Sequence, residues 1–185
     1  MKTSHSILVI SFFVAVGFGC GSKVDTKAAR NEAHARCVGA PQEKACSEWG
    51  RKALADFPTE VAAAEAEKSE ISRLAASLRS EDLLGLQGAY TAKLGGLYAD
   101  KKEVVKAVEC VEDGLGVMLK GIKDHPESKT LRIYYVATIS SLPEIFKKHQ
   151  ETIDSIASLR ARFKLTESEA KIVQDAQDRA SKSGK

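Results

Sequence analysis

Apolar residues recur at steps of three and four positions along most of the chain after residue 27, with charged and polar residues between them. This is the period of an amphipathic α-helix, and no stretch alternates apolar and polar residues over a full strand length. Alanine, glutamate, lysine, leucine and arginine, which favour helices, dominate the same stretch. We therefore predict an all-α fold with helices over residues 27–36, 42–56, 59–79, 81–99, 102–123, 128–140, 143–163 and 167–180.

Residues at the predicted helix ends support this division. Phe57-Pro58 and Asp124-His125-Pro126 each end a helix, because proline restricts the residue before it. Ser141–Glu144 and Thr166–Glu169 each have the spacing of a capping box, which begins a helix. Helices joined by such short connections lie antiparallel to their neighbours, so we expect antiparallel helical hairpins.

The helix predicted over residues 102–123 has the clearest apolar stripe. It contains Val104, Val108, Val111, Leu115, Met118 and Ile122 at helical spacing, widened by Val105, Cys110 and Leu119. A stripe this long must be covered by other helices, so we expect this helix to lie at the centre of the fold. From Gln174 onward the sequence turns polar, which predicts that residues 166–185 form a polar C-terminal helix with a frayed tail.

The N-terminus carries a short apolar segment over residues 7–16, after a lysine at position 2. About ten apolar residues are too few to cross a hydrocarbon layer of about 30 Å as a helix, and the segment has the form of a secretory signal. The sequence Gly17-Phe18-Gly19-Cys20 that follows resembles the end of the signal in bacterial lipoprotein precursors, although that family favours leucine where this chain has Gly17. An ordinary signal peptide, with Cys20 free or in a disulfide, is the alternative.

The resemblance to bacterial lipoproteins implies a specific organisation. Residues 1–19 are then a signal peptide that is removed, residues 20–26 a tether that begins with a lipid-modified Cys20, and residues 27–165 the helical domain. Acyl chains such as palmitate would hold the protein on a bilayer without help from the folded part. In that family an aspartate directly after the cysteine often retains the protein at the inner membrane. This chain has Gly21 there, which favours the outer membrane and its periplasmic side.

Three cysteines remain when the lipid-modified one is set aside, and an exported chain meets conditions in which disulfides persist. Cys37 and Cys46 flank a turn at residues 38–41, so we predict a disulfide between them. The alternative is a zinc site made by His34, Cys37 and Cys46, but the sequence offers neither a fourth ligand nor the short ligand spacings of structural zinc sites. We therefore predict no metal.

Charge and composition limit the function. The 185 residues suit one domain with a tail, and 28 basic residues oppose 25 acidic ones, giving a formal charge of +3 with both signs interspersed. Nucleic-acid binding needs a concentrated basic stripe, which the sequence lacks, so we expect none. The sequence also contains no zinc-protease helix, nucleophile elbow or phosphate-binding loop. We therefore predict that the protein is not an enzyme and uses no cofactor.

One predicted helix pair has a repeat-like spacing. Leu94-Gly95 is followed by Tyr98 and then by Ala107, which resembles the tetratricopeptide repeat signature, and residues 53–58 resemble the end of such a repeat. The chain departs from the family at Gly114, where alanine is preferred, and its helix-ending proline comes later. The resemblance implies hairpins whose small residues let two helices approach closely, with the tyrosine filling the groove that they leave. An irregular helical bundle is the alternative.

Five amphipathic aromatic residues are candidates for lining a partner groove. They are Trp49, Tyr90, Tyr98, Tyr134 and Tyr135. Packing of these side chains in the core, with the hydroxyls reaching outward, is the alternative.

Together these observations predict an envelope-anchored, non-catalytic scaffold that binds a protein or peptide partner on a concave helical surface. One alternative is an accessory lipoprotein that holds a small apolar ligand between helices, for transport or envelope-lipid handling, which requires a closed cavity. Another is a structural spacer that only self-associates. A homo-oligomer is compatible with each of these functions.

Overall fold

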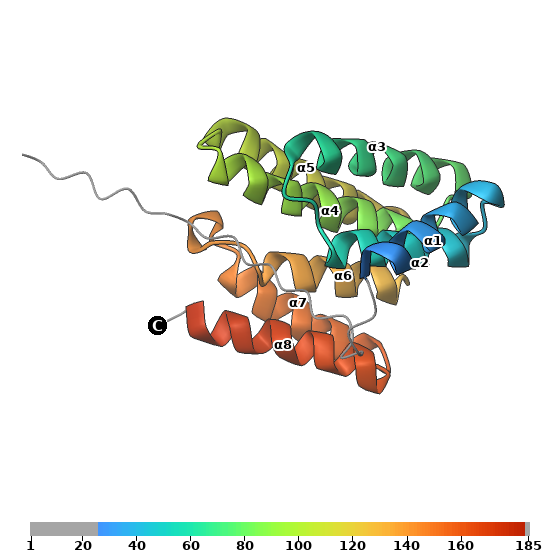
Figure 1. Ribbon diagram of the computed structural model, residues 1–185. Helices are drawn as coiled ribbons and strands as arrows, with labels where there is room; N and C mark the ends of the chain where they lie inside the picture. Colours follow the sequence, from blue (N-terminus) through green and yellow to red (C-terminus); the bar gives the residue numbers. More distant parts are fainter. Residues whose placement is uncertain (1–25, 184–185) are drawn as a thin grey trace, which may run out of the picture.

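The structure, a computed structural model, describes residues 26–183 of the chain (Figure 1). Within these residues it consists of eight α-helices and one short 3₁₀ helix, with no strand, so the predicted all-α fold of packed helical hairpins is confirmed. The elements are α1 (Thr26–Gly39), α2 (Glu43–Ala55), α3 (Val61–Leu78), α4 (Glu81–Asp100), α5 (Val104–Asp124), α6 (Lys129–Ile139), η1 (Glu144–Phe146), α7 (His149–Arg162) and α8 (Glu167–Ser183). The predicted signal peptide, Cys20 and the tether up to residue 25 lie outside the described residues.

Most helix ends lie within a few residues of the predicted ones, because local capping groups fix them. The Ser80 and Ser128 side chains cap α4 and α6, each accepting a hydrogen bond from the backbone amide three residues later. The predicted capping box before α8 is present. The Thr166 amide donates to the Glu169 carboxylate at 2.7 Å, and the Glu169 amide donates to the Thr166 hydroxyl at 3.4 Å.

The prediction of a single helix over residues 143–163 is wrong. The segment begins with the one-turn η1, and α7 starts only after Lys147, whose φ of 51° is in the left-handed region that interrupts a helix. The predicted capping box at the start of this segment is missing as well. The Ser141 hydroxyl instead donates to the Ala137 carbonyl oxygen at 2.9 Å, back into α6.

The central helix is α4, and the prediction that residues 102–123 form the centre is wrong. α4 packs against α2, α3, α5 and α6, and most of its side chains are buried. α5 packs on α4 and α6 and leaves Val104, Val105 and Leu119 at 62%, 71% and 46% exposure. Its buried stripe consists of Ala107, Val111, Gly114, Leu115, Met118 and Gly121. The three exposed apolar residues lie beside the stripe and face solvent, whereas Cys110 and Ile122 are partly buried against the core.

Small residues bring the backbones of α4 and α5 into direct contact. A Cβ atom built on Gly114 would lie 2.5 Å from the Gly88 carbonyl oxygen and 2.6 Å from the Ala92 nitrogen. A Cβ atom on Gly95 would lie 2.6 Å from the Ala107 carbonyl oxygen. Gly95 and Ala107 are the small residues of the repeat-like spacing, and these two positions do meet between the helices.

α6 connects two apolar clusters of the molecule. Tyr134, Tyr135 and Ile139 belong to the larger cluster, which α1–α5 complete, whereas Ile133 and Val136 pack with α7 and α8. Figure 1 shows this arrangement: α7 and α8 lie on one side of α6, and α3 lies at the opposite face of the molecule. Removing α6 would therefore separate the two clusters.

The C-terminal helix is longer and better packed than predicted. α8 continues to Ser183, and its Val173, Ala176 and Ala180 are buried. The prediction that the chain frays from Gln174 is therefore wrong as far as residue 183, because this face of α8 packs against the rest of the fold.

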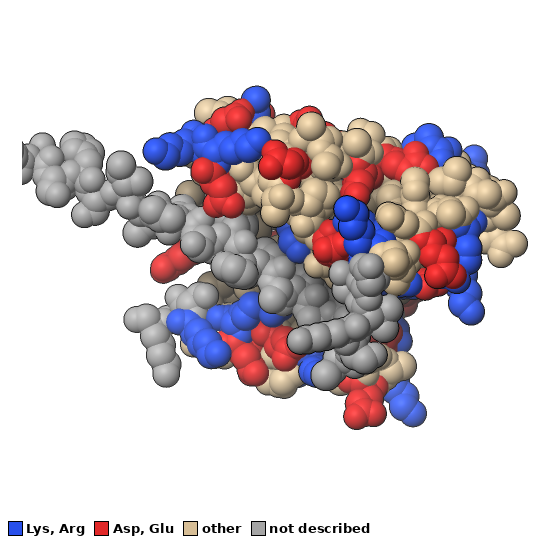
Figure 2. Space-filling view, in the orientation of Figure 1, with Lys and Arg blue, Asp and Glu red and all other residues tan. Residues whose placement is uncertain are grey.

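Basic and acidic side chains are intermixed over the face of the molecule drawn in Figure 2. Neither sign forms a large patch of its own on that face. Between residues 26 and 183, none of the helices combines the length and the apolarity that crossing a membrane requires.

Candidate functional site

An open groove lies between α1, α2 and α3. It encloses about 640 Å³ and opens to solvent, and we call it the N-terminal groove. Its lining comprises Lys27, Arg30, Asn31, His34 and Val38 of α1, Trp49 of α2, and Ala66, Glu67 and Glu70 of α3. The α1 residues are spaced so that they share one helical face, which forms a full wall of the groove.

A disulfide fixes the C-terminal end of α1. Cys37 and Cys46 are bonded and completely buried, so the predicted pairing is present. Because both sulfurs are consumed in the bond, neither is a thiolate that can bind zinc. Among residues 26–183 no group of three or more potential metal-binding side chains is positioned to hold an ion. The disulfide therefore holds α1 against α2, next to Trp49.

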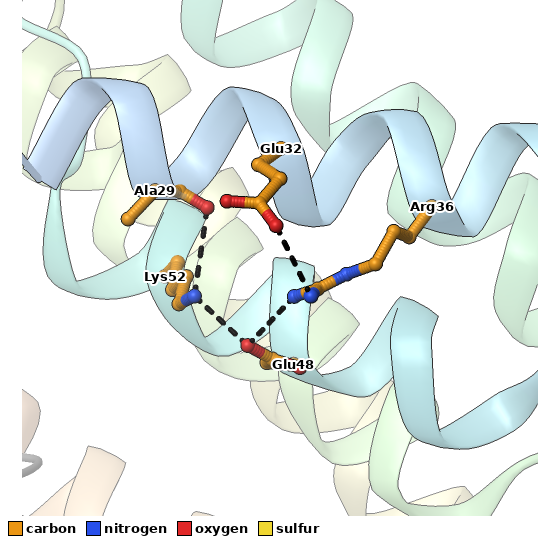
Figure 3. Close-up of polar contacts among 5 residues, drawn as sticks. All are labelled: Ala29, Glu32, Arg36, Glu48 and Lys52. Carbon is orange, nitrogen blue, oxygen red and sulfur yellow. Dashed lines mark hydrogen bonds and ion pairs between the residues drawn. The ribbon is translucent and has the colours of Figure 1, made fainter.

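A small network of ion pairs, in which Arg36 and Glu48 link α1 to α2, adds to this attachment (Figure 3). The Glu48 carboxylate pairs with Lys52 at 2.8 Å and with Arg36 at 3.1 Å, and Arg36 also reaches Glu32 at 3.4 Å. The hydrogen bond from Lys52, together with the neighbouring arginines, lowers the pKa of Glu48. Half-exposed pairs of this kind contribute little to stability, so the disulfide remains the stronger link between α1 and α2.

Arg30 connects α1 to the floor of the groove. Its side chain is 14% exposed and donates to the Asp56 carbonyl oxygen at 2.6 Å, while its other terminal nitrogen pairs with Glu67. Glu67 in turn accepts a hydrogen bond from the Tyr90 hydroxyl at 2.5 Å. This chain of contacts joins α1, α3 and α4, so the charged floor of the groove is already organised without a ligand.

An apolar strip lies beside these charges. The His34 ring packs on the Trp49 ring with centroids 4.7 Å apart, and Trp49 itself is 3% exposed. Val38 is 51% exposed at the end of the same wall. The groove therefore offers an apolar strip bordered by cations from α1 and carboxylates from α3, a combination that suits binding of a peptide segment.

The five aromatic candidates do not line one groove. Trp49 lines the N-terminal groove, and Tyr135 lines a second groove described below. Tyr90, Tyr98 and Tyr134 are at most 7% exposed, as the core-packing alternative expects. Each tyrosine hydroxyl donates to a carboxylate: Tyr90 to Glu67, Tyr98 to Glu65, Tyr134 to Asp82 and Tyr135 to Glu151.

Sequence reasoning missed the α1 wall of the N-terminal groove. Lys27, Arg30, His34 and Val38 carry no catalytic or aromatic motif, and α1 is polar on most of its surface. The signal that identifies them is their spacing, which places them on one face of a helix that the disulfide fastens to the core.

The second groove lies between α5 and α7, with α6 at its floor, and we call it the C-terminal groove. It encloses about 470 Å³ and is also open to solvent. Its lining comprises Leu119 and Ile122 of α5, Arg132, Tyr135 and Val136 of α6, and Glu151, Asp154, Ser155 and Ser158 of α7. It shares no residue with the N-terminal groove.

The tyrosine contacts predict an unusual behaviour at alkaline pH. The hydrogen bond to Glu65 raises the pKa of Tyr98 to about 12, and burial raises the pKa of Tyr90, Tyr134 and Tyr135 further. These are all four tyrosines of the chain. The folded protein is therefore expected to show almost no phenolate absorbance at about pH 10.5, where the unfolded chain is more than half ionised.

The same shifts set the pH dependence of stability. Above the ordinary tyrosine pKa near 10, the folded chain keeps protons that the unfolded chain has lost, so the free energy of unfolding falls as the pH rises toward 12 and beyond. Burial lowers the pKa of Lys93, which works in the opposite direction, whereas the raised pKa values of Cys110 and Lys106 add to the fall in stability. Urea unfolding at a series of pH values measures the slope, and a rise in stability above pH 10 would contradict the assignment.

No protein family, curated protein or solved structure matches the chain in the comparisons made with it. The resemblances to lipoprotein precursors and to tetratricopeptide repeats therefore stay predictions that rest on the residues quoted for them.

Proposed function

We propose that the chain is a lipid-anchored, non-catalytic scaffold on the periplasmic side of a bacterial outer membrane, which binds a peptide segment of a partner protein in the N-terminal groove. The observation that carries this proposal is the groove itself. It is open, lined by Trp49, and framed by charges of both signs that Arg30 and the Cys37–Cys46 disulfide hold in place.

The position of α1 relative to the expected anchor supports the proposal. Cys20 precedes Thr26, the first residue of α1, by six positions, and Lys27 already lines the groove. Six extended residues span at most about 20 Å. A lipid on Cys20 would therefore keep the N-terminal groove close to the bilayer surface, where it can meet other envelope proteins.

The dimensions of the groove favour an extended peptide. Its α1 wall runs from Lys27 to Val38, twelve residues whose first and last Cα atoms lie about 16 Å apart along the helix axis. An extended chain of about five residues has the same length. Both described grooves are open to solvent, so a partner can enter either of them from outside. The alternative function, a small apolar ligand held between helices, would require a closed cavity.

The anchor is tested by growing cells with radiolabelled palmitate. We expect label in the wild-type product and recovery of that product with the membrane fraction, because two or more acyl chains bind a bilayer stably. A Cys20→Ser variant is expected to lose both the label and the membrane association. Equal fractionation of the two proteins would contradict the anchored form.

The binding site is tested with a synthetic hexapeptide library applied to the purified full chain, with the fluorescence of Trp49, the only tryptophan, as the signal. Val38→Glu places a carboxylate in the apolar strip and is expected to abolish binding of the selected peptides. The matched control is Ile145→Glu, a similar change at a position 61% exposed and outside the groove. An equal loss of peptide binding in both variants would contradict the proposal, and so would a library from which no sequence is selected. A small molecule found bound to the protein by native mass spectrometry would favour the ligand-carrying alternative.

A further inference from the structure

The two walls of the C-terminal groove differ in chemistry. The α5 wall is apolar, with Leu119 46% exposed and Ile122 half-buried beside it. The same flank of α5 continues to Val108 and Val105, of which Val105 is 71% exposed. An occupant must therefore present apolar side chains toward α5.

The α7 wall is polar along its length. Glu151, Asp154, Ser155 and Ser158 follow the i, i+3, i+4, i+7 spacing of one helical face, which spans about 10 Å. No apolar side chain of α7 lines the groove. An occupant needs hydrogen-bonding or charged groups on the side that faces α7, so it must itself be amphipathic.

Charge at the α7 wall favours a cationic occupant. Glu151 already accepts a hydrogen bond from Tyr135 and pairs with Lys148 at 2.5 Å. Asp154 accepts a hydrogen bond from the Gln150 amide at 2.9 Å, and no cation of residues 26–183 forms an ion pair with it. The exposed Asp154 carboxylate is thus available to a lysine or arginine of a partner.

Arg132 favours a hydrogen-bond acceptor on the occupant, at the end of the groove away from Asp154. Its Nη2 donates to the Pro126 carbonyl oxygen at 2.9 Å, but its buried Nε has no hydrogen-bond partner. Arg162 donates to the same carbonyl oxygen at 3.2 Å, but it is already paired with the Glu127 carboxylate at 2.7 Å. Arg132 itself forms no ion pair with any carboxylate of residues 26–183. An acceptor group on the occupant would satisfy this region, and the unpaired carbonyl oxygens at the C-terminus of a helix are such acceptors.

We propose that the C-terminal groove is an interaction surface for an amphipathic helix of a partner protein, with apolar residues facing Leu119 and Ile122 and a lysine or arginine facing Asp154. The C-terminal end of this helix lies toward Arg132, so it runs in the same direction as α7. Because the two grooves share no lining residue, this inference stands apart from the proposed function.

The test uses a fluorescein-labelled amphipathic peptide of leucine and lysine, about 14 residues long so that it is able to form a helix. Fluorescence anisotropy with the purified full chain is expected to show saturable binding. Asp154→Lys and Leu119→Glu are both expected to weaken binding about tenfold or more. Both positions are exposed, so the variants are expected to fold, and circular dichroism checks this.

Matched controls distinguish binding in the C-terminal groove from nonspecific electrostatic attraction of the peptide to the protein. Asp113→Lys makes the same charge change on an exposed part of α5 outside the groove, and Val38→Glu alters only the N-terminal groove. Neither is expected to change the affinity for the peptide. A scrambled peptide that is not amphipathic is expected to bind at least about tenfold more weakly.

Three results would overturn the inference. One is an equal loss of affinity in Asp113→Lys and Asp154→Lys. Another is equal binding of the scrambled peptide. The third is a dimer in sedimentation that Leu119→Glu dissociates, since a second copy of the chain would then occupy the groove.

Discussion

Gly114→Ala is expected to destabilise the fold by about 3 kcal/mol or more, whereas Gly116→Ala, two residues further along the same helix, stabilises it by about 0.5–1 kcal/mol. The added methyl group is the same in both variants. At position 114 it would meet the backbone of α4, with the Gly88 oxygen at 2.5 Å and the Ala92 nitrogen at 2.6 Å. At position 116 nothing lies within 4 Å of the new atom.

The two substitutions are expected to change stability in opposite directions, because only the one at position 114 forces other atoms to move. Backbone atoms of the central helix α4 cannot rotate away as a flexible side chain does, so α4 and α5 must separate along their contact. At the exposed position 116 the only effect is the higher helix propensity of alanine over glycine. Urea unfolding followed by circular dichroism measures both changes, and a shift of the two midpoints in the same direction would contradict this description of the α4–α5 contact.

Prolines, capping residues and helical periodicity act locally, which is why the order of the helices and most of their ends could be predicted from the sequence. The centre of the fold could not. A helix covered on several sides has apolar and small residues all round, so α4 shows no stripe, whereas the half-exposed α5 shows a strong one. The apolar pattern of residues 104–122 therefore indicated a helix at the edge of the core.

The candidate site was predictable only in part. Trp49 and Tyr135 were identified by residue type, and each lines a groove. Their partners come from distant segments: no local rule connects Tyr98 with Glu65, or Tyr134 with Asp82, 52 residues away. Four tyrosines that look suited to a partner surface are instead tied to carboxylates of the protein itself.

The second large effect is expected when the disulfide is removed. A Cys37→Ala/Cys46→Ala double variant loses a link that closes a loop with a sequence separation of 9, which stabilises by about 2–3 kcal/mol on the chain-entropy estimate. The loss falls mainly on α1, because only Ala33 and Cys37 of its described side chains are fully buried. The other α1 contacts described above are ion pairs, hydrogen bonds and the ring contact of His34 with Trp49. We expect α1 to separate from α2 while α3–α6 keep their packing.

The fluorescence of Trp49 reports this separation directly. In the intact protein Trp49 is 3% exposed beneath His34, so loss of α1 would expose it to water and shift its emission to longer wavelength. Cys110→Ala is the control, since that cysteine is a free thiol outside the disulfide and is expected to leave the emission unchanged. If the double variant kept both the wild-type emission and the wild-type unfolding midpoint, the ion pairs and Arg30 alone would hold α1. The N-terminal groove would then not depend on the disulfide.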